Sequence, residues 1–305
     1  MKILVSTSTF AAVDLGPLDL LKNLGMEVVL NPFGRKLTKA EIIALLMPDV
    51  CGLVAGLETL DEEVLKASSL KVISRVGAGI SNIDLDAARR LGIKVFSTPD
   101  APTSAVAELT LGAMLWLLRS ISLMDRELHE DRWQKILGAQ LEGKTVAVIG
   151  YGRIGRRVAE LVKAFGAHVI CVDPAVRADA GCAKVLPLDR ALAVADIITI
   201  HVSGEQEIIG PKEFALMKKG VLVLNAARGG VVNEGLLMKA LDEKKVIGAW
   251  LDTFFEEPYQ GPLVKYPQVL LTPHVGSFTA ECRKRMEMEA IENLLCGLRE
   301  AGIHG

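Results

Sequence analysis

Aromatic residues are scarce in this chain of 305 residues: Phe, Trp and Tyr together make up 5% of it, although half of the residues are hydrophobic. The core must therefore be built from Ala, Val, Ile and Leu, a composition typical of buried parallel strands covered by helices. Neither sign of charge dominates, since 35 Lys and Arg residues stand against 37 Asp and Glu residues. This balance excludes the basic surface expected of a nucleic-acid-binding protein.

The chain also lacks paired cysteines and long hydrophobic runs. Its five cysteines form no C-x-x-C pair, and Cys51 and Cys171 fall inside apolar strand patterns. We therefore expect reduced, buried thiols and no metal site. The longest apolar run, Leu109–Leu118, is too short to cross a bilayer, and Met1–Ser6 is too short for a signal peptide. These absences predict a cytoplasmic protein with neither a membrane nor a nucleic acid as partner.

Strand and helix patterns alternate in two blocks, which predicts two parallel sheets with helical crossovers. Between the blocks, residues 100–120 form a long helix that is apolar nearly all round, so we expect it to be buried between two domains or two subunits. Residues 121–140 are polar and irregular in pattern, and Thr279–Leu298 has the period of a last helix. The expected strands are Lys2–Ser6, Glu27–Leu30, Gly52–Ala55, Val72–Arg75 and Lys94–Ser97, followed by Thr145–Ile149, His168–Val172, Ile197–His201, Val221–Asn225, Val246–Leu251 and Val269–Thr272.

The second block opens with an apolar strand that runs into a G-x-G-x-x-G turn formed by Gly150, Gly152 and Gly155. The first glycine permits a tight turn, the second lets the backbone approach a pyrophosphate, and the third lets the next helix pack close to the sheet. That helix starts near Arg153 and Ile154 and directs its free N–H groups at the phosphates. The turn therefore predicts a dinucleotide site.

An acidic residue, Asp173, closes the next strand 18 residues after the last of these glycines. Its carboxylate can accept hydrogen bonds from both ribose hydroxyls and would repel a 2′-phosphate, which predicts NAD rather than NADP. Arg177, four residues further along, is the one feature that could favour NADP. We interpret Arg177 as a solvated loop charge.

Four other strands end in residues that suit chemistry on a small acid. Ligands of open α/β sheets bind beyond the carboxyl ends of the strands, so these four ends are expected to share one site. Val72–Arg75 is followed by the glycine-rich turn Val76, Gly77, Ala78 and Gly79, Val221–Asn225 by Arg228, Val246–Leu251 by Glu257, and Val269–Thr272 by His274.

These residue types suit hydride exchange between a dinucleotide and a 2-hydroxy or 2-keto acid. Consecutive N–H groups of the glycine-rich turn could bind the substrate carboxylate. Arg228 can hold that carboxylate and polarise the carbonyl group. His274 can donate a proton when the ketone is reduced and accept one in the reverse direction. Glu257 beside it would orient the ring and favour its protonated form.

Taken together, the motifs resemble the D-isomer-specific 2-hydroxyacid dehydrogenases over essentially the whole chain. The resemblance implies that Arg228, Glu257 and His274 are the catalytic trio. It also implies that Asp252, with the backbone near Ala226, meets the nicotinamide amide, and that His201 lies near the cofactor. The matching segments are Arg75–Asp84, Ala105–Gly112, Gly143–Gly155, Asn225–Glu234, Gly248–Asp252 and Thr272–Gly276.

The resemblance further implies an α/β fold of two doubly wound parallel-sheet domains. A Rossmann NAD-binding domain, residues 99–277, would be inserted into a smaller, flavodoxin-like substrate domain, residues 1–98 and 278–305, with a hinged cleft between the two. Members of the family are usually dimers joined through the long helix and the segment after it. We therefore expect a homodimer formed through residues 102–140.

Within the family, the phosphoglycerate dehydrogenases are the most similar group, on the basis of Ala55–Leu65 and Pro99–Thr103. This likeness implies interconversion of 3-phosphoglycerate and 3-phosphohydroxypyruvate in serine biosynthesis, with Arg75 and Lys135 contacting the phosphate. An equally good interpretation is that both cations are solvated or paired structurally. The chain stops soon after its last helix, so we expect no C-terminal regulatory domain and no serine inhibition through one.

Two other functions stay open at this point. A glyoxylate or hydroxypyruvate reductase would use the same trio, whereas formate dehydrogenases of the family pair the histidine with Gln, so Glu257 argues against them. An NAD-sensing binding protein, like the transcriptional corepressors of this fold, would bind NADH with little turnover, and the intact trio argues against it. The chain departs from the family pattern at Ser81, Val202–Glu205 and Trp250.

Overall fold

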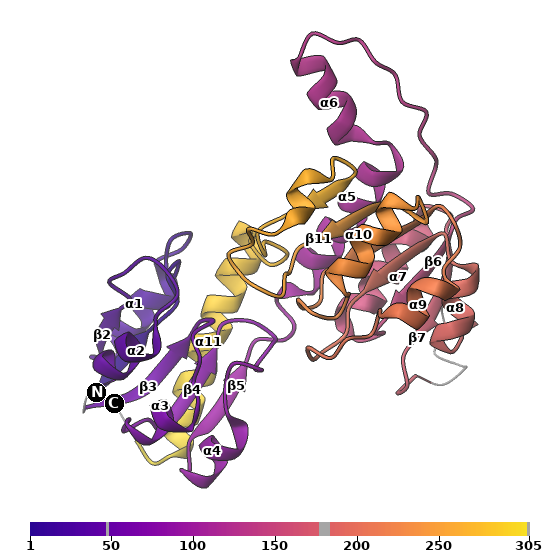
Figure 1. Ribbon diagram of the computed structural model, residues 1–305. Helices are drawn as coiled ribbons and strands as arrows, with labels where there is room; N and C mark the ends of the chain where they lie inside the picture. Colours follow the sequence, from indigo (N-terminus) through magenta and orange to yellow (C-terminus); the bar gives the residue numbers. More distant parts are fainter. Residues whose placement is uncertain (47–48, 177–183, 304–305) are drawn as a thin grey trace. The chain divides into compact units, whose positions relative to one another are not determined.

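The computed structural model describes residues 1–46, 49–176 and 184–303 (Figure 1). The chain divides into two compact units: unit 1 comprises Met1–Pro102 and Phe278–Gly305, and unit 2 comprises Thr103–Ser277. The sequence placed the first boundary after residue 98, whereas in the structure it follows Pro102. Unit 2 is therefore an insertion into unit 1.

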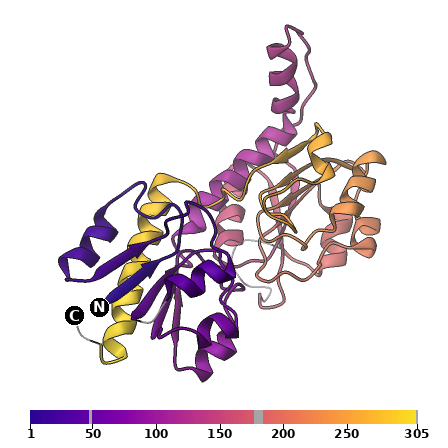
Figure 2. The same cartoon turned by 60° about the vertical axis from the view of Figure 1, so that its left-hand side comes forward.

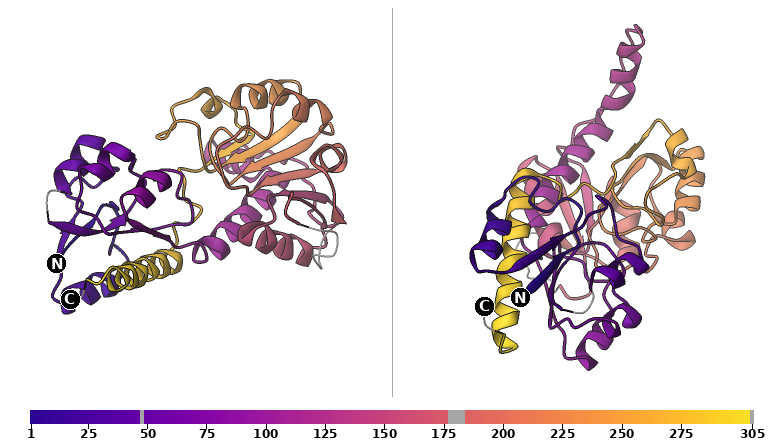
Figure 3. Two further views of the ribbon diagram at one scale, coloured as in Figure 1. Left: turned by 90° about the horizontal axis from the view of Figure 1, so that it is seen from below. Right: turned by 90° about the vertical axis from the view of Figure 1, so that its left-hand side faces the viewer.

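Unit 1 is built on a five-stranded sheet in the order β2-β1-β3-β4-β5, with every strand pair parallel. This is the flavodoxin-like order. Helices α1 and α11 cover one face of the sheet, and α2, α3 and α4 cover the other (Figure 3). The elements are β1 (Lys2–Val5), α1 (Gly16–Asn23), β2 (Glu27–Leu30), α2 (Lys39–Leu45), β3 (Val50–Ala55), α3 (Glu62–Lys66), β4 (Val72–Arg75), α4 (Leu85–Arg90), β5 (Lys94–Ser97) and α11 (Ala280–Glu300).

Unit 2 is built on a seven-stranded parallel sheet in the order β12-β11-β10-β9-β6-β7-β8. Counted from β6, six of these strands follow the Rossmann order 3-2-1-4-5-6, which confirms the predicted fold class. The elements are α5 (Pro102–Leu118), α6 (Ile121–His129), β6 (Thr145–Ile149), α7 (Arg153–Ala164), β7 (His168–Val172), β8 (Lys184–Val185), α8 (Leu188–Val194), β9 (Ile197–Ile200), α9 (Pro211–Leu216), β10 (Val221–Asn225), α10 (Glu234–Asp242), β11 (Val246–Leu251), the 3₁₀ helix η1 (Pro262–Lys265) and β12 (Val269–Leu271).

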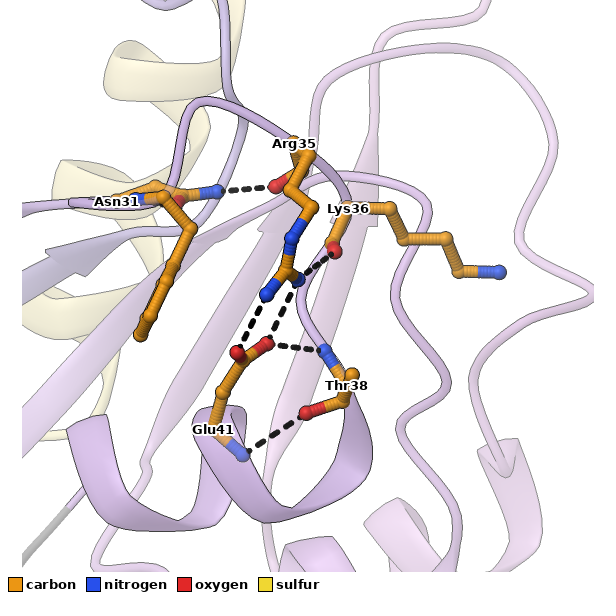
Figure 4. A network of polar contacts seen from close by, with 6 residues as sticks. Asn31, Arg35, Lys36, Thr38 and Glu41 are labelled. Atoms are coloured by element: carbon orange, nitrogen blue, oxygen red, sulfur yellow. Dashed lines mark hydrogen bonds and ion pairs between the residues drawn. The ribbon is translucent and has the colours of Figure 1, made fainter. Parts of the chain in front are cut away.

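The loop that joins β2 to α2 shows how local sequence fixes the carboxyl edge of the unit 1 sheet (Figure 4). Thr38 caps α2, because its Oγ1 accepts the N–H of Glu41 at 3.4 Å while the Glu41 carboxylate accepts the N–H of Thr38 at 2.8 Å. Arg35 holds the same carboxylate with two hydrogen bonds of 2.9 and 2.7 Å. Asn31 donates to the carbonyl of Arg35 at 2.8 Å, so both ends of the loop are fixed.

Residues 121–140 depart most clearly from the prediction of an irregular segment. The structure forms α6 there, followed by an extended stretch, and both reach away from the rest of unit 2 (Figures 1 and 2). Helix α6 has no buried residue, while Trp133 is 80% exposed and Leu137 fully exposed. Ile121, Met124 and Leu128 lie at helical spacing and give α6 an apolar stripe, which the prediction of an irregular segment missed.

The long helix α5 is buried on one side only. Ala113 and Met114 belong to the core of unit 2, whereas Gly112 and Trp116 are exposed. None of the described helices is long and apolar enough to cross a membrane on its own; α5 and α6 reach that length and composition as a pair but are bent by 65° where they meet.

The cysteines that the structure describes are all free. Cys171 and Cys282 are buried, Cys51 is half-buried and Cys296 is exposed. Cys182 and Arg177 lie outside the described residues, so the interpretation of Arg177 as a solvated loop charge stays a prediction.

Candidate active site and dinucleotide turn

The glycine-rich turn joins β6 to α7 in unit 2. Gly150 has φ +86°, and a Cβ there would come within 2.6 Å of the carbonyl oxygen of His201, so only glycine fits. A Cβ on Gly155 would overlap the carbonyl of Gly150, whereas one on Gly152 would meet nothing within 4 Å. Gly152 is also the N-cap of α7 and provides no side-chain acceptor. The first N–H groups of α7 are therefore open to an anion such as a pyrophosphate.

Asp173 directly follows β7 and is fixed by backbone donors. Its Oδ2 accepts the N–H of Tyr151 at 2.7 Å, and its Oδ1 accepts the N–H of Ala175 at 2.8 Å. Each carboxylate oxygen keeps a lone pair for a ribose hydroxyl. Arg153 is exposed and Ile154 half-buried on the first turn of α7. The set of donors and acceptors fits NAD.

His201 follows β9 and lies against Gly150. Its Nε2 is 2.8 Å from Oγ1 of Thr199, and its buried Nδ1 has no hydrogen-bond partner among the described residues. Burial lowers the pKa of His201 to about 3, so the ring is neutral at physiological pH and provides no charge to a phosphate. Ala226, whose N–H donates to the carbonyl of Ile200 at 3.4 Å, begins the turn after β10.

Arg228 is held on that same turn by the side chain of Asn225. The amide of Asn225 donates to the carbonyl of Arg228 at 2.9 Å and accepts the N–H of Ala227 at 3.0 Å. The half-buried Arg228 donates through Nη1 to the carbonyl of Ala227 at 2.7 Å. A Cβ on Gly229 would overlap the carbonyl of Phe254, so the arginine turn packs directly on the loop that follows β11.

His274 and Glu257 form the hydrogen bond that the sequence predicted them to share. Nδ1 of His274 lies 2.9 Å from Oε2 of Glu257, and the two side chains are 33% and 35% exposed. The other carboxylate oxygen accepts the N–H of Phe254 at 3.1 Å. Burial alone would raise the pKa of Glu257, but the hydrogen bond and charge of His274, the N–H of Phe254 and the charge of Arg228 outweigh it, so this pKa lies below its ordinary value.

Asp252 holds the turn on which His274 stands. Its Oδ1 accepts the Thr272 hydroxyl at 2.6 Å and the Val275 N–H at 2.9 Å, and its Oδ2 accepts the Gly276 N–H at 2.7 Å. His274 has φ +53°, a left-handed conformation that non-glycine residues seldom adopt, and the flanking bonds to Asp252 keep it there. The carboxylate assigned to the nicotinamide amide is 2% exposed and largely engaged by this turn.

A tryptophan at an unusual position completes that network. Trp250 is fully buried, and its Nε1 donates to Oγ1 of Thr272 at 2.9 Å. Thr272 therefore passes its own hydrogen to Asp252, since the indole can only donate. Thr272 begins one of the family motifs, but its role depends on Trp250 and Asp252 at the end of β11, which precede it by 22 and 20 residues.

The substrate turn predicted after β4 lies in unit 1 and is smaller than expected. Gly77 has φ +133°, and its N–H donates to Oγ1 of Thr98 at 2.7 Å. The N–H of Val76 donates to the carbonyl of Ala55 at 3.0 Å. The expected nest of three N–H groups is therefore reduced to those of Ala78 and Gly79.

The two cations predicted to meet a phosphate differ in burial. Arg75 ends β4, is 8% exposed and donates through its guanidinium to the carbonyl of Val76. Lys135 is exposed on the extended stretch after α6, in unit 2.

One further acidic residue follows a strand of unit 1 and was not predicted as a site residue. Glu58 lies three positions beyond β3 and is 1% exposed. Its Oε1 accepts the Ser6 hydroxyl and, at 3.0 Å, the N–H of Gly56. Glu58 follows a strand end, but its contact with Ser6, 52 residues away, forms only once β1 and β3 pair.

A comparison with known protein families identifies the family to which these motifs belong. The sequence profile of the D-isomer specific 2-hydroxyacid dehydrogenase, NAD binding domain, matches residues 111–276. The match covers the glycine turn, Asp173 and the Arg228, Glu257 and His274 trio, and it confirms the predicted NAD-binding domain.

Three similar proteins extend the comparison beyond that domain. D-3-phosphoglycerate dehydrogenase of Sus scrofa is 36% identical over 88% of this chain, and that of Methanocaldococcus jannaschii is 40% identical over 81%. The chain spans about half the length of these curated relatives, 51% and 49%. The crystal structure of a glyoxylate reductase from Paecilomyes thermophila is 30% identical, covers all of this chain and 97% of its own, and has a TM-score of 0.88.

Proposed function

The chain belongs to the D-isomer-specific 2-hydroxyacid dehydrogenase family, and from that premise we propose that it is an NAD-dependent dehydrogenase of D-2-hydroxy acids. The observation that carries the proposal is the 2.9 Å hydrogen bond between His274 Nδ1 and Glu257 Oε2, in the same unit as the dinucleotide turn. A histidine oriented by a carboxylate is a suitable acid and base for a carbonyl or hydroxyl oxygen.

The cofactor would be held by Gly150, Gly152, Gly155 and Asp173, and NAD supplies or accepts the hydride when it is bound. The assignment of Asp252, with the backbone near Ala226, to its amide group belongs to this proposal, and so does the proximity of His201. The residues Arg153 and Ile154 contribute the first N–H groups of α7.

The protein's own groups manage the proton and the carboxylate. Because Nδ1 of His274 is bonded to Glu257, Nε2 is the nitrogen left to give a proton to the substrate oxygen or to take one from it. The negative charge of Glu257 stabilises the ring while it carries that proton. Arg228 would bind the substrate carboxylate and polarise the carbonyl. Within unit 1, the N–H groups of Ala78 and Gly79 are the donors proposed for a carboxylate.

Two substrates are candidates. The D-3-phosphoglycerate dehydrogenases among the relatives favour 3-phosphoglycerate and 3-phosphohydroxypyruvate, with Arg75 and Lys135 proposed for the phosphate. The similar glyoxylate reductase favours glyoxylate or hydroxypyruvate. If glyoxylate or hydroxypyruvate is the substrate, Arg75 would be a structural residue. Its hydrogen bond to the carbonyl of Val76 agrees with such a role.

We also propose that the protein is a homodimer formed through residues 102–140. The exposed apolar side chains of Trp133 and Leu137, together with the open surface of α5 at Gly112, support it, since such a surface is costly to leave in water. Light scattering would find a monomer if this is wrong, and Leu137→Glu should weaken the dimer. Location in the cytoplasm remains a prediction that cell fractionation would test.

The test of the proposed function is oxidation of NADH by the purified protein against glyoxylate, pyruvate, hydroxypyruvate and 3-phosphohydroxypyruvate, with NADPH as control. Turnover of at least one keto acid with NADH is expected. Tight NADH binding without turnover of any of them would instead support an NAD-sensing binding protein.

A further inference from the structure

Glu58 lies where a ligand is expected in the sheet of unit 1. In the order β2-β1-β3-β4-β5, the strand order reverses between β1 and β3, and open α/β sheets bind ligands at such a switch point, beyond the carboxyl ends of the strands. Ser6 directly follows β1, and Glu58 lies on the loop that follows β3. Their hydrogen bond therefore sits at the switch point.

The loop that carries Glu58 is fixed from several sides. Oε1 of Glu58 accepts the hydroxyl of Ser6 and the N–H of Gly56, while the amide of Asn82 donates to the Glu58 carbonyl at 2.6 Å. Ser6 is fixed in turn by Asn31, whose amide donates to its carbonyl at 2.7 Å. The carboxylate is thus held in one orientation before any ligand binds.

Half of this carboxylate has no role within the fold. Oε2 of Glu58 accepts no hydrogen bond from any described residue, and Glu58 forms no ion pair with one. A brace between Ser6 and Gly56 needs only one carboxylate oxygen, and Oε2 does not belong to the buried, unpartnered side-chain atoms of the described residues, so it is open to a donor from outside the fold. Thr7, which lies against Gly56, also has a buried hydroxyl oxygen without a described partner. Oε2 of Glu58 and the hydroxyl oxygen of Thr7 are thus two acceptors at this edge that a polar ligand group could use.

The same edge carries the turn proposed for the substrate carboxylate. Asn82, which holds Glu58, ends the glycine-rich stretch that contains Ala78 and Gly79, and its carbonyl accepts the N–H of Leu60 at 2.8 Å. The loops after β3 and β4 are therefore tied into one hydrogen-bonded edge. The turn of Ala78 and Gly79 and the loop of Glu58 therefore belong to the same carboxyl edge of the unit 1 sheet.

We propose that Glu58 determines the choice of substrate: it accepts a hydrogen bond from a hydroxyl on carbon 3 of the 2-keto acid and repels a phosphate at that position. The inference rests on the proposed dehydrogenase function and selects between its two substrate candidates. It assigns hydroxypyruvate, rather than 3-phosphohydroxypyruvate, as the preferred class of substrate.

The test compares kcat/KM with NADH for hydroxypyruvate, pyruvate and 3-phosphohydroxypyruvate. For the wild-type protein, hydroxypyruvate should exceed pyruvate by about tenfold or more, because the hydroxyl bonds to a charged acceptor. Glu58→Gln should raise the ratio of 3-phosphohydroxypyruvate to hydroxypyruvate by about tenfold, because the repulsive charge is removed. Glu63→Gln, which removes an exposed carboxylate from α3 of the same unit, should leave that ratio unchanged.

Three outcomes count against the assignment. A wild-type preference for 3-phosphohydroxypyruvate overturns it without any variant, so it can be decided even if Glu58→Gln fails to fold. If Glu58→Gln changes kcat/KM equally for all three substrates, Glu58 has a structural role and does not select the substrate. Absence of turnover with all three would overturn the proposed function itself, and this inference with it.

Discussion

The acids at the strand ends of unit 2 have protein partners on both carboxylate oxygens, whereas the corresponding acid of unit 1 has partners on one. In Asp173 and Asp252, each carboxylate oxygen accepts a hydrogen bond from a backbone N–H group. In Glu257, one oxygen is hydrogen-bonded to the ring of His274 and the other accepts the N–H of Phe254. Glu58 uses Oε1 alone among the described residues.

This difference in hydrogen bonding suits the carboxylates of the two units to different roles. A carboxylate whose two oxygens both accept protein donors is held rigidly, as Asp252 is by the His274 turn, and suits steps common to every substrate. A carboxylate with one oxygen to spare can bond a substituent that varies between substrates. Unit 2 therefore carries the features expected for cofactor and proton chemistry, and unit 1 carries the feature expected for substrate choice.

The largest effect is expected from His274→Gln, which removes the proton-transfer group that the unit 2 acids orient. The rate of keto acid reduction should fall by about 10²–10⁴, the usual contribution of a positioned acid or base. NADH affinity, followed by protein fluorescence, should stay close to wild type, because His274 belongs to the turn after β12 and not to the glycine turn. Normal reduction by the variant would show that another group transfers the proton.

The sequence predicted more of the candidate site in unit 2 than in unit 1. The glycine turn and the trio lie in short motifs at strand ends, so local sequence together with the family resemblance was enough to predict them. The N–H of Gly77 is taken by Thr98, 21 residues away, and Glu58 is held by Ser6, 52 residues away. Pairings over such distances exist only after the sheet has formed, and so no local pattern predicts them. Helix α6 differs, because the spacing of Ile121, Met124 and Leu128 is a local helical pattern that could have predicted it.

The next largest effect should come from a matched pair of substitutions in the glycine turn. Gly155→Ala places a methyl group against the carbonyl of Gly150 and should lower the free energy of unfolding by about 1–3 kcal/mol. Gly152→Ala meets no atom within 4 Å, so its unfolding should match the wild type while its NADH affinity falls. Urea denaturation and NADH titration separate the two effects, and equal unfolding free energies for the two variants would contradict the packing argument.

A smaller effect is expected when the charge of Asp173 is removed. Asp173→Asn keeps an acceptor for the N–H of Tyr151 but no longer repels a 2′-phosphate. The kcat/KM ratio of NADPH to NADH should rise by about tenfold, the range of one charge contact near a protein surface. If the wild-type protein already uses NADPH as well as NADH, the role given to Asp173 is wrong.

The smallest effect concerns acid stability in unit 1, at the loop between β2 and α2. Hydrogen bonds from Arg35 and from the backbone of Thr38 lower the pKa of Glu41 from 4.5 to about 2. Because this pKa is lower in the folded chain than in the unfolded one, the ionised carboxylate stabilises the fold above about pH 4.5, and that stability is lost as the pH falls towards 2. Wild type should therefore exceed Glu41→Gln in urea resistance at pH 7, and the difference should shrink at pH 3. Glu63→Gln is the control, since it removes an exposed carboxylate outside this network. A difference between wild type and Glu41→Gln that stays constant from pH 7 to pH 3 would mean that Glu41 acts through its neutral contacts, and that charge plays no part in fixing this edge of unit 1.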